Sequence, residues 1–500
     1  MKPSQSEDEL QAQSEPSHVP HGGAPEPISL LRLVALVVGP LSLVPFLVLP
    51  PPADLPIEGW RLIGMTLWMV IWWLTETLPL PATALMPIAL MPVLGIRPIG
   101  EVTAQYGNHL IFLFLGGFIL AAGMQRWGLH RRIALLIVAK VGKSPEGIVA
   151  GFMLATAFLS MWISNTATTV MMFTVGISVI DFIDSKTADK ALVRNFGVGL
   201  MLAIAYSASI GGVGTLIGTP PNALLASLLS DNYGIEIGFF RWMLLGMPVV
   251  IVMLPLCYLL LTRVIFPARG LQMDTVQGVI QDELAKLGRM DRGETIVAIV
   301  FGLAAFCWIF RSFLHLPVTD SGIAMIAALL LFALPVGRKE GFVLDWSVAR
   351  SLPWGVLMLF GGGLALAAGF ESSGLAKWIG TLVGGFSTVP LWVLVAIVSV
   401  TIIYLTEITS NTASTATFLP ILGAVAVGLG LPVEWLTLPV ALGASMAFMM
   451  PVATPPNAIV FSYDGMTLGD MVKAGFVLNI LSAITVFAAV MGLAPLIFGL

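Results

Sequence analysis

The chain has little charge and very little cysteine for its length. Charged residues make up 10% of its 500 positions, whereas soluble domains carry roughly 25%. Cys257 and Cys307 lie far apart in apolar segments, which excludes a disulfide framework, and we interpret them as free core thiols. The five histidines lack zinc-ligand spacing. A net charge of -4 gives no support for nucleic-acid binding.

What the chain has instead is apolar sequence, with 57% hydrophobic residues and a mean hydropathy of +0.95. Apolar runs at 238–262, 295–310, 322–336 and 474–500 approach the roughly 20 residues that cross a bilayer. Unpaired backbone cannot face lipid, so these spans must be helical. We therefore predict an all-α polytopic membrane protein with about 11 transmembrane helices plus two re-entrant hairpins. No nucleophile–base pair or nucleotide motif occurs in the spans, which argues against an enzyme.

The distribution of Lys and Arg predicts the orientation, because these residues collect on the cytoplasmic side. The two densest groups flank the apolar segment 147–184 and comprise Arg126, Arg131, Arg132, Lys140 and Lys143 on one side and Lys186, Lys190 and Arg194 on the other. If both groups are cytoplasmic, that segment is a re-entrant hairpin. The N-terminus is then cytoplasmic and the C-terminus external, in the inner or plasma membrane. Residues 1–28 read as a disordered cytoplasmic tail without a signal peptide.

Several motifs occur twice. Ser-Asn-Thr stands at 164–166 and 410–412, an offset of 246, and Gly116-Gly117 matches Gly362-Gly363 at the same offset. Thr-Pro-Pro-Asn stands at 219–222 and 454–457, an offset of 235. Average composition predicts a given Ser-Asn-Thr at about one position in ten thousand. Two homologous halves are therefore indicated.

These motifs predict the domain organisation. A first transmembrane helix at 29–59 precedes repeat 1 at 60–268, which contains the hairpin 147–184 and a broken helix near 218–222. A cytoplasmic linker at 269–294 joins it to repeat 2 at 295–500, with a hairpin at 388–431 and a broken helix near 453–457. An odd number of crossings per half inverts the second repeat, as in secondary transporters. The alternative is two tandem copies that merely enlarge a bundle, but the identities lie at helix-breaking and polar positions.

The repeated motifs supply polar groups at membrane depth. A Pro-Pro pair unwinds the preceding backbone, whose carbonyls suit a hard cation, while the resumed helix N-terminus suits an anion. Ser160 and Thr406, one turn before the tips, add hydroxyls on the same helix face. These two side chains could alternatively bond back to their own helix. Glu76 and Glu407 are either functional carboxylates or structural ones.

No Lys, Arg or His occurs at 151–185, 196–240 or 380–472. An anion at the repeated motifs therefore meets no cationic side chain, and neutral donors offset its dehydration only weakly. We expect bound cations to supply the missing positive charge, which would couple the two binding events.

The paired Ser-Asn-Thr and Pro-Pro-Asn motifs resemble those of the divalent anion/sodium symporter family. The resemblance covers nearly the whole chain after the tail and implies a homodimer with an elevator mechanism. It implies one sodium site at Ser160, Ser164, Asn165 and the Gly218 backbone, and another at Thr406, Thr409, Asn411 and the Ala453 backbone. It places the dianionic substrate among Asn165, Thr166, Thr219, Asn411, Thr412, Thr454 and Pro455.

The resulting hypothesis is sodium-coupled symport of a C4-type dicarboxylate such as succinate or malate, with Na⁺ as coupling ion. Alternatives within transport are a symporter of sulfate or another divalent oxyanion and a dicarboxylate exchanger. An alternative from another class is a receptor that binds the anion without moving it. The duplicated motifs favour a transporter over a receptor.

Overall fold

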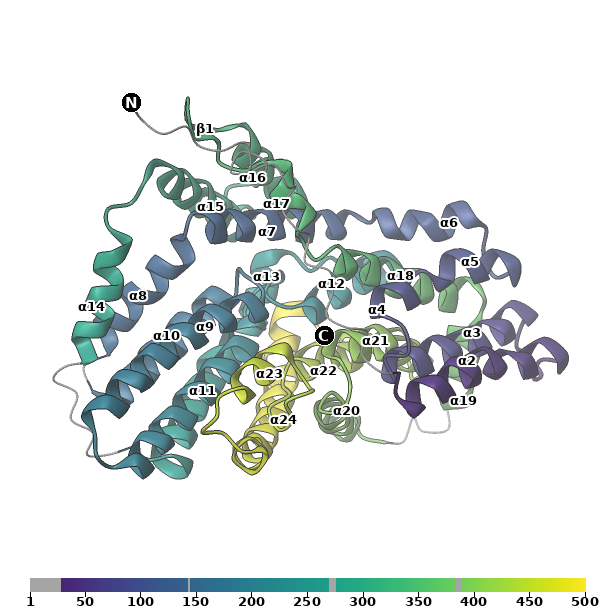
Figure 1. Cartoon of the computed structure of the whole chain (residues 1–500). Helices are drawn as coiled ribbons and strands as arrows, with labels where there is room; N and C mark the ends of the chain where they lie inside the picture. The colour runs from purple at the N-terminus through teal and green to yellow at the C-terminus, as the bar shows by residue number, and fades with distance from the viewer. Residues whose placement is uncertain (1–27, 143, 269–275, 384–388) are drawn as a thin grey trace, which may run out of the picture.

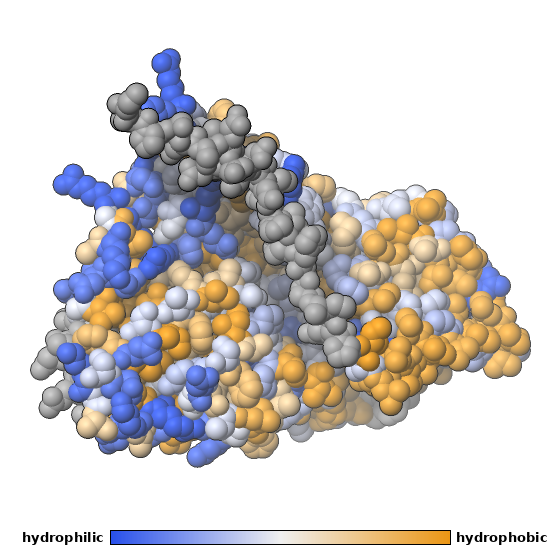
Figure 2. Space-filling model, viewed as in Figure 1, coloured by the Kyte–Doolittle hydropathy of each residue, from blue (hydrophilic) through white to orange (hydrophobic). Residues whose placement is uncertain are grey.

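The computed structural model describes residues 28–142, 144–268, 276–383 and 389–500, in which helices dominate and one short hairpin pairs β1 (Pro335–Gly337) with β2 (Gly341–Phe342) (Figure 1). The predicted tail at 1–28 lies almost entirely outside these residues. Across the described residues, nine helical segments are long and apolar enough to cross a membrane. These spans confirm the expectation of a polytopic, mainly helical membrane protein. Figure 2 shows a hydrophobic surface over α2 and α3.

The first half of the chain runs from α2 to the end of α13 and η2. Its elements are α2 (Leu30–Val48), α3 (Ile57–Leu74), α4 (Leu80–Thr83), α5 (Met86–Val93), α6 (Ile99–Ala104), η1 (Gln105–Gly107), α7 (His109–Arg126), α8 (Leu129–Val141), α9 (Pro145–Ser160), α10 (Asn165–Lys186), α11 (Lys190–Gly212), α12 (Pro220–Tyr233), α13 (Phe239–Leu259) and η2 (Leu260–Ile265).

The second half follows a similar order. Its elements are α14 (Val276–Leu287), α15 (Arg292–Phe310), α16 (Asp320–Ala333), α17 (Trp346–Arg350), α18 (Trp354–Ser372), α19 (Leu375–Val383), α20 (Leu391–Leu405), α21 (Asn411–Gly428), α22 (Glu434–Ala444), α23 (Pro455–Phe461) and α24 (Leu468–Phe498).

The segments predicted as hairpins each contain two helices joined by a short tip. Segment 147–184 corresponds to α9 and α10, and segment 388–431 corresponds to α20 and α21. Ser164 begins α10 as its N-cap, with its hydroxyl accepting a 3.3 Å hydrogen bond from the Ala167 amide. The repeated Asn165 and Asn411 are the first residues of α10 and α21.

Both helices predicted to be broken are interrupted earlier in the chain than expected. Helix α11 ends at Gly212 and α22 ends at Ala444, whereas Pro220 and Pro455 already begin α12 and α23. The predicted breaks near 218–222 and 453–457 therefore overlap the observed interruptions at 213–219 and 445–454, which begin earlier in the chain and end before the prolines. The physical reason is that proline is favourable in the first helical turn, where its missing N–H has no intrahelical partner. The prolines restart each helix, and the unwound backbone precedes them.

The predicted linker at 269–294 contains an unpredicted helix, and α15 already begins at Arg292. Helix α14 packs against α8 and α10, with Ile280 buried. Glu283 of α14 forms ion pairs with Lys286 and with Arg131 of α8, and hydrogen bonds from these cations hold the pKa of that carboxyl below its usual range. A 12-residue helix is marginal alone. Tertiary contacts therefore stabilise α14.

The two halves interlock around the interrupted helices. Helix α12 of the first half packs against α21 and α22 of the second, and α23 of the second half packs against α10 and α11 of the first. Phe114 of α7 and Phe360 of α18, which are separated by the motif offset of 246, contact each other with ring centroids 5.1 Å apart. This interlocking brings both tips and both interruptions to one place.

Candidate ion and anion site

A cavity of about 710 Å³ lies where the two tips and the two interruptions meet. All seven predicted substrate residues line it, as do Ser164, Gly218 and Ala453 from the predicted sodium sites. Ser160, Thr406 and Thr409 lie behind this lining and are buried. The sequence did not indicate the opposite wall, which α7 and the start of α18 provide through residues such as Phe118, Gln125 and Pro353.

The first tip is tied together through the Asn165 side chain. The Ser160 hydroxyl approaches both the Asn165 Oδ1 and the carbonyl oxygen of Ala208, the latter at 2.8 Å. The Asn165 carbonyl accepts a 2.7 Å hydrogen bond from the Thr169 hydroxyl. Ser160 thus connects the end of α9, the start of α10 and the last turns of α11, and it donates to Ala208 and not to its own helix.

The second tip repeats this arrangement. The Thr406 hydroxyl lies 2.7 Å from Asn411 Oδ1 and 3.2 Å from the Ala444 carbonyl oxygen. The Thr415 hydroxyl donates to the Asn411 carbonyl at 2.7 Å. Back-bonding was the alternative for Ser160 and Thr406, and neither hydroxyl shows it. The Thr409 hydroxyl does bond back to its own helix and donates to the Leu405 carbonyl at 2.9 Å.

The two interruptions are also braced alike. The side-chain amide of Asn222 donates to the carbonyls of Gly212 and Thr215, at 3.1 and 2.7 Å. The amide of Asn457 donates to Ala447 and Met450, at 3.2 and 3.0 Å. The Asn of each Thr-Pro-Pro-Asn motif therefore fixes the conformation of the unwound segment before it. The Thr and the first Pro of each motif line the cavity.

The Asn165 side chain and the Gly218 carbonyl lie close together beside Gly212. A Cβ built on Gly212 would lie 2.8 Å from Asn165 Oδ1, 3.1 Å from Asn165 Nδ2 and 3.2 Å from the Gly218 carbonyl oxygen, so two oxygens and one amide nitrogen approach one point. Neutral oxygens are the ligands that hard cations accept. The residues therefore fit a small cation there. Ala447 stands at the corresponding position of the second half, so this observation applies to the first site only.

Glu407 is a structural carboxylate that shapes the second interruption. It is buried and accepts hydrogen bonds from the amides of Phe448, Met449 and Met450 at 2.6 to 3.0 Å, and from the Asn479 side chain at 2.7 Å. Buried amides without partners destabilise a protein, so this carboxylate stabilises the unwound segment. Sequence reasoning could not name these partners.

Glu76 faces the cavity from the loop between α3 and α4. Its backbone has a positive φ of 47° and its side chain is 54% exposed, 4.0 Å from the Arg32 guanidinium. Among the described residues that line the cavity, Glu76 is the only one with an ionisable side chain. The described part of the cavity wall therefore carries no cationic side chain to hold an anion.

Interrupted helices that offer neutral hydroxyls, amides and helix N-termini to a cavity within a many-span protein define a membrane transporter, not an enzyme. The chain belongs to the family described as the sodium:sulfate symporter transmembrane region, whose model matches residues 29–498.

Several relatives match nearly the whole chain. One is the sodium-dependent dicarboxylate transporter SdcS of Staphylococcus saprophyticus, 43% identical over 480 residues, or 94% of this chain and 92% of that protein. Another is SdcS of Staphylococcus aureus strain RF122, 42% identical over 95% of this chain and 94% of that protein. Among solved structures, the YdaH transporter of Alcanivorax borkumensis matches with 14% identity and a TM-score of 0.47, over 80% of this chain and 88% of that one.

Proposed function

We infer that this chain is a secondary active transporter that imports C4-type dicarboxylates together with sodium ions across the cell membrane. The observation that carries the inference is a cavity built from two matched sets of neutral oxygens and amides, without a basic residue in its described wall. Relatives that match the chain nearly end to end are named sodium-dependent dicarboxylate transporters. The symport therefore follows from both the family and the chemistry of the site.

Each tip supplies one cation site in this proposal. The first uses Ser160, Ser164, Asn165 and the Gly218 carbonyl, and the second uses Thr406, Thr409, Asn411 and the Ala453 carbonyl. The proximity of Asn165 Oδ1 and the Gly218 carbonyl oxygen to one point beside Gly212 supports the first site. The hydrogen bond that orients Asn411 Oδ1 supports the second.

The substrate carboxylates bind between the two cation sites. Asn165, Thr166 and Thr219 contact the dianion from one side, and Asn411, Thr412, Thr454 and Pro455 contact it from the other. The N-termini of α12 and α23 add partial positive charge. These weak donors alone do not replace the hydration of two carboxylates. Bound sodium supplies the remaining charge, and this requirement couples the downhill entry of sodium to dicarboxylate uptake.

The proposal includes two inverted repeats, an elevator motion and a homodimer, with the N-terminus cytoplasmic and the C-terminus external. Support for the repeats comes from the reciprocal packing of α12 and α23 and from the contact between Phe114 and its counterpart Phe360. Support for the orientation comes from the basic residues of α8, which pair with Glu283 and Glu294 near the linker. They place Arg131 and Arg132 beside the linker, and the rule that assigns the cytoplasmic side counts Lys and Arg residues whether or not they are paired.

A sulfate symporter is the second candidate, because the family description names sodium and sulfate. Neutral hydroxyls and amides bind either carboxylates or a tetrahedral oxyanion. The match to dicarboxylate transporters over more than nine-tenths of the chain favours the dicarboxylate.

Uptake of labelled succinate into proteoliposomes tests the function. We expect accumulation with an inward sodium gradient and no accumulation when choline replaces sodium, and excess unlabelled sulfate should compete poorly. Sodium-independent counterflow of succinate would indicate an exchanger. Stronger competition by sulfate than by unlabelled succinate would indicate the oxyanion symporter. Saturable succinate binding without any uptake would indicate a receptor.

A further inference from the structure

Two adjacent cavities lie away from the two tips, where the ends of α12 and α18 meet α19 and α21 (Figure 1). The larger has a volume of about 610 Å³ and includes the apolar side chains of Leu228, Phe370 and Pro420 in its wall. The smaller has a volume of about 310 Å³, and apart from Ala368 its described lining is polar, comprising Arg97, Gln105, Asp231, Asn232, Glu371 and Ser372. Asn232 and Glu371 line both cavities, so the polar cavity adjoins the apolar one. Both volumes fall within the range of about 300–1,000 Å³ that is typical of ligand sites.

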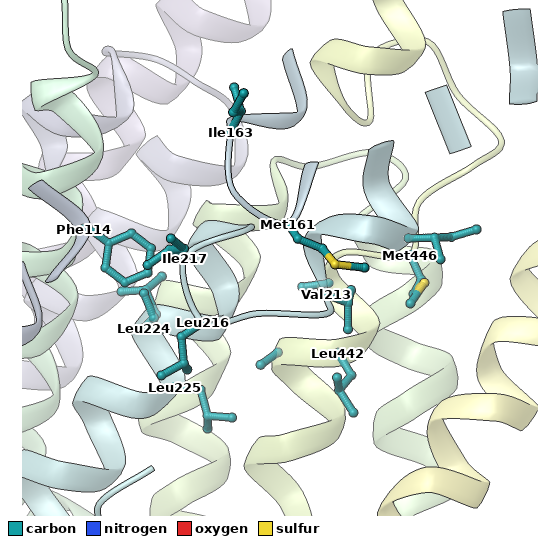
Figure 3. Close-up of a cluster of buried hydrophobic side chains, with 14 of the residues drawn as sticks. Phe114, Met161, Ile163, Val213, Leu216, Ile217, Leu224, Leu225, Leu442 and Met446 are labelled. Carbon is teal, nitrogen blue, oxygen red and sulfur yellow. The ribbon is translucent and has the colours of Figure 1, made fainter. Parts of the chain in front are cut away.

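These two cavities are separate from the cavity at the tips. Among the described residues, they share no lining residue with it. Thr219, the N-cap of α12, lines the cavity at the tips, whereas Leu228 and Asn232 near the end of α12 line the second pair. Between these positions, Leu224 and Leu225 are buried in the hydrophobic cluster that Figure 3 shows. The proposed transport site therefore does not account for the second pair of cavities.

Arg97 brings a partly unpaired guanidinium group to the polar cavity. Its Nε donates a 2.8 Å hydrogen bond to Glu101 Oε2, and this ion pair orients the side chain. Arg97 Nη1 is shielded from solvent and has no hydrogen-bond acceptor among the described residues. Buried donors without partners are rare in native proteins, and guanidinium groups are complementary to phosphates and carboxylates. The polar cavity therefore fits an anionic group beside Arg97.

The same cavity also carries two carboxylates. Asp231 accepts a hydrogen bond from the Asn108 side chain, which fixes its position. Neither Asp231 nor Glu371 forms a salt bridge with any residue that the structure describes. These carboxylates repel an anion that has no positive charge of its own, and Arg97 repels a simple cation. A ligand that carries both charges satisfies all three groups.

The adjoining apolar cavity indicates what is attached to the two charges. Val427, one of its lining residues, is 50% exposed, and Leu382, which follows the lining residue Thr381, is 57% exposed. Apolar surface thus extends from the cavity wall to the outside of a protein that is surrounded by lipid. Charged pockets between membrane helices bind lipid headgroups, and apolar surface at membrane depth contacts acyl chains. A zwitterionic headgroup with an attached acyl chain matches the two cavities.

We propose that the two cavities together bind one molecule of a zwitterionic aminophospholipid such as phosphatidylethanolamine. Arg97 binds the phosphate, Asp231 and Glu371 bind the ammonium group, and one acyl chain lies along Leu228 and Phe370. An ammonium group donates hydrogen bonds to carboxylates, whereas the quaternary amine of phosphatidylcholine has no N–H to donate. The bound lipid contacts α12 of the first half and α18 of the second.

Native mass spectrometry of full-length, delipidated protein tests this lipid site. The protein is titrated with phosphatidylethanolamine, phosphatidylcholine and phosphatidylglycerol that have identical acyl chains, and the dissociation constant of the first bound lipid is measured. We expect phosphatidylethanolamine to bind at least about 10-fold more tightly than either of the others, because one lacks N–H donors and the other lacks positive charge. Equal affinities for the three lipids would overturn the assignment.

Glycerophosphoethanolamine, which has the headgroup without acyl chains, tests the role of the apolar cavity. We expect it not to displace the bound lipid at equal concentration, because it buries no acyl chain. Displacement at equal concentration would assign the site to a soluble zwitterion and overturn the lipid.

Variants test the individual contacts. Arg97→Gln should weaken binding of phosphatidylethanolamine by about 10-fold or more, because the phosphate loses its charged donor. Glu101→Gln is the matched control, since it removes the partner of Arg97 but keeps the guanidinium, and its affinity should stay within about 3-fold of the unmodified protein. Glu371→Gln should lower the preference for phosphatidylethanolamine over phosphatidylglycerol by about 10-fold.

Thermal unfolding without added lipid checks that each variant folds, and Glu371→Gln decides the outcome if Arg97→Gln does not fold. Unchanged affinity in Arg97→Gln or an unchanged lipid preference in Glu371→Gln would overturn the site. Equal losses in Arg97→Gln and Glu101→Gln would assign the effect to their ion pair and overturn the phosphate contact. The readout is lipid binding and not uptake, so failure here leaves the proposed transport function intact.

Discussion

The two tips present nearly identical polar groups to the cavity but are supported in different ways. In the first, Trp162 packs into an aromatic cluster with α13 and α15. In the second, Ile408 is exposed, and support comes from the adjacent Glu407, whose carboxylate holds the amides of the second interruption. The same ligand geometry is therefore maintained by packing in one half and by a buried polar network in the other.

The interruptions differ accordingly. Met161 occupies the position that corresponds to Glu407, and it contributes a main-chain carbonyl that accepts a hydrogen bond from Thr215. The second interruption spans 445–454 and the first only 213–219. A longer unwound segment exposes more amides that need partners. The Glu407 carboxylate lies beside the longer, second interruption and accepts hydrogen bonds from its amides.

The largest expected effect tests what the tips share. Asn165→Ala and Asn411→Ala each remove an oriented amide oxygen from a proposed cation site. Each also removes an N–H group that donates a hydrogen bond to the dianion in the proposed site. We expect each variant to lose at least about 100-fold of sodium-driven succinate uptake, since ligand groups and their partners each account for large factors in ion affinity. Uptake is measured in proteoliposomes, with chromatographic monodispersity as the folding control. Near-normal uptake by either variant would refute the equivalence of the two tips.

The second prediction separates the tips by their support. Glu407→Gln places an amide donor against backbone donors, and we expect a loss of about 1–3 kcal/mol in stability. Met161→Gln is the matched change at the first tip and should destabilise less. Thermal unfolding in detergent compares the two variants. Equal unfolding temperatures would mean that the carboxylate network of Glu407 contributes no more to stability than the Met161 side chain.

The third prediction concerns the aromatic cluster. Trp162→Ile makes the first tip resemble the second and removes stacking worth about 0.5–1.5 kcal/mol per aromatic pair. We expect this variant to lose about 1–3 kcal/mol of stability, because the indole packs against three aromatic rings. Ile408→Trp is the reciprocal control and should change stability little, because Ile408 is 70% exposed. Thermal unfolding in detergent compares the variants, and an unchanged unfolding temperature in Trp162→Ile would show that the stacking does not support the first tip.

The smallest expected effect comes from exchanging the hydroxyl residues behind the tips. Ser160→Thr and Thr406→Ser both keep the hydroxyl that orients the Asn oxygen. We expect sodium affinity to change by less than about 3-fold, because the hydrogen bond is retained. Ser160→Ala, which removes it, should lower sodium affinity by about 10-fold or more. Sodium titration of succinate uptake distinguishes the variants, and equal affinity in Ser160→Ala would show that this hydroxyl is dispensable.

Much of the site could be predicted because its signals are local. The paired Ser-Asn-Thr and Thr-Pro-Pro-Asn motifs indicated which segments meet, and they line one cavity. The exact helix interruptions were less predictable, since local sequence marks where a proline-led helix restarts better than where the preceding helix ends. Helix α14 was missed because a short helix depends on the surface against which it packs.

By itself, the sequence determined that the chain is a helical membrane protein with two polar, proline-marked interruptions, because composition and helix-breaking residues act over a few positions. Only the tertiary structure decided what Glu407 does and which tip is docked. The partners of Glu407 lie 41 to 72 residues away along the chain. Trp162 and Ile408 are both apolar residues in equivalent motifs, and only packing against distant helices makes one of them buried and the other exposed.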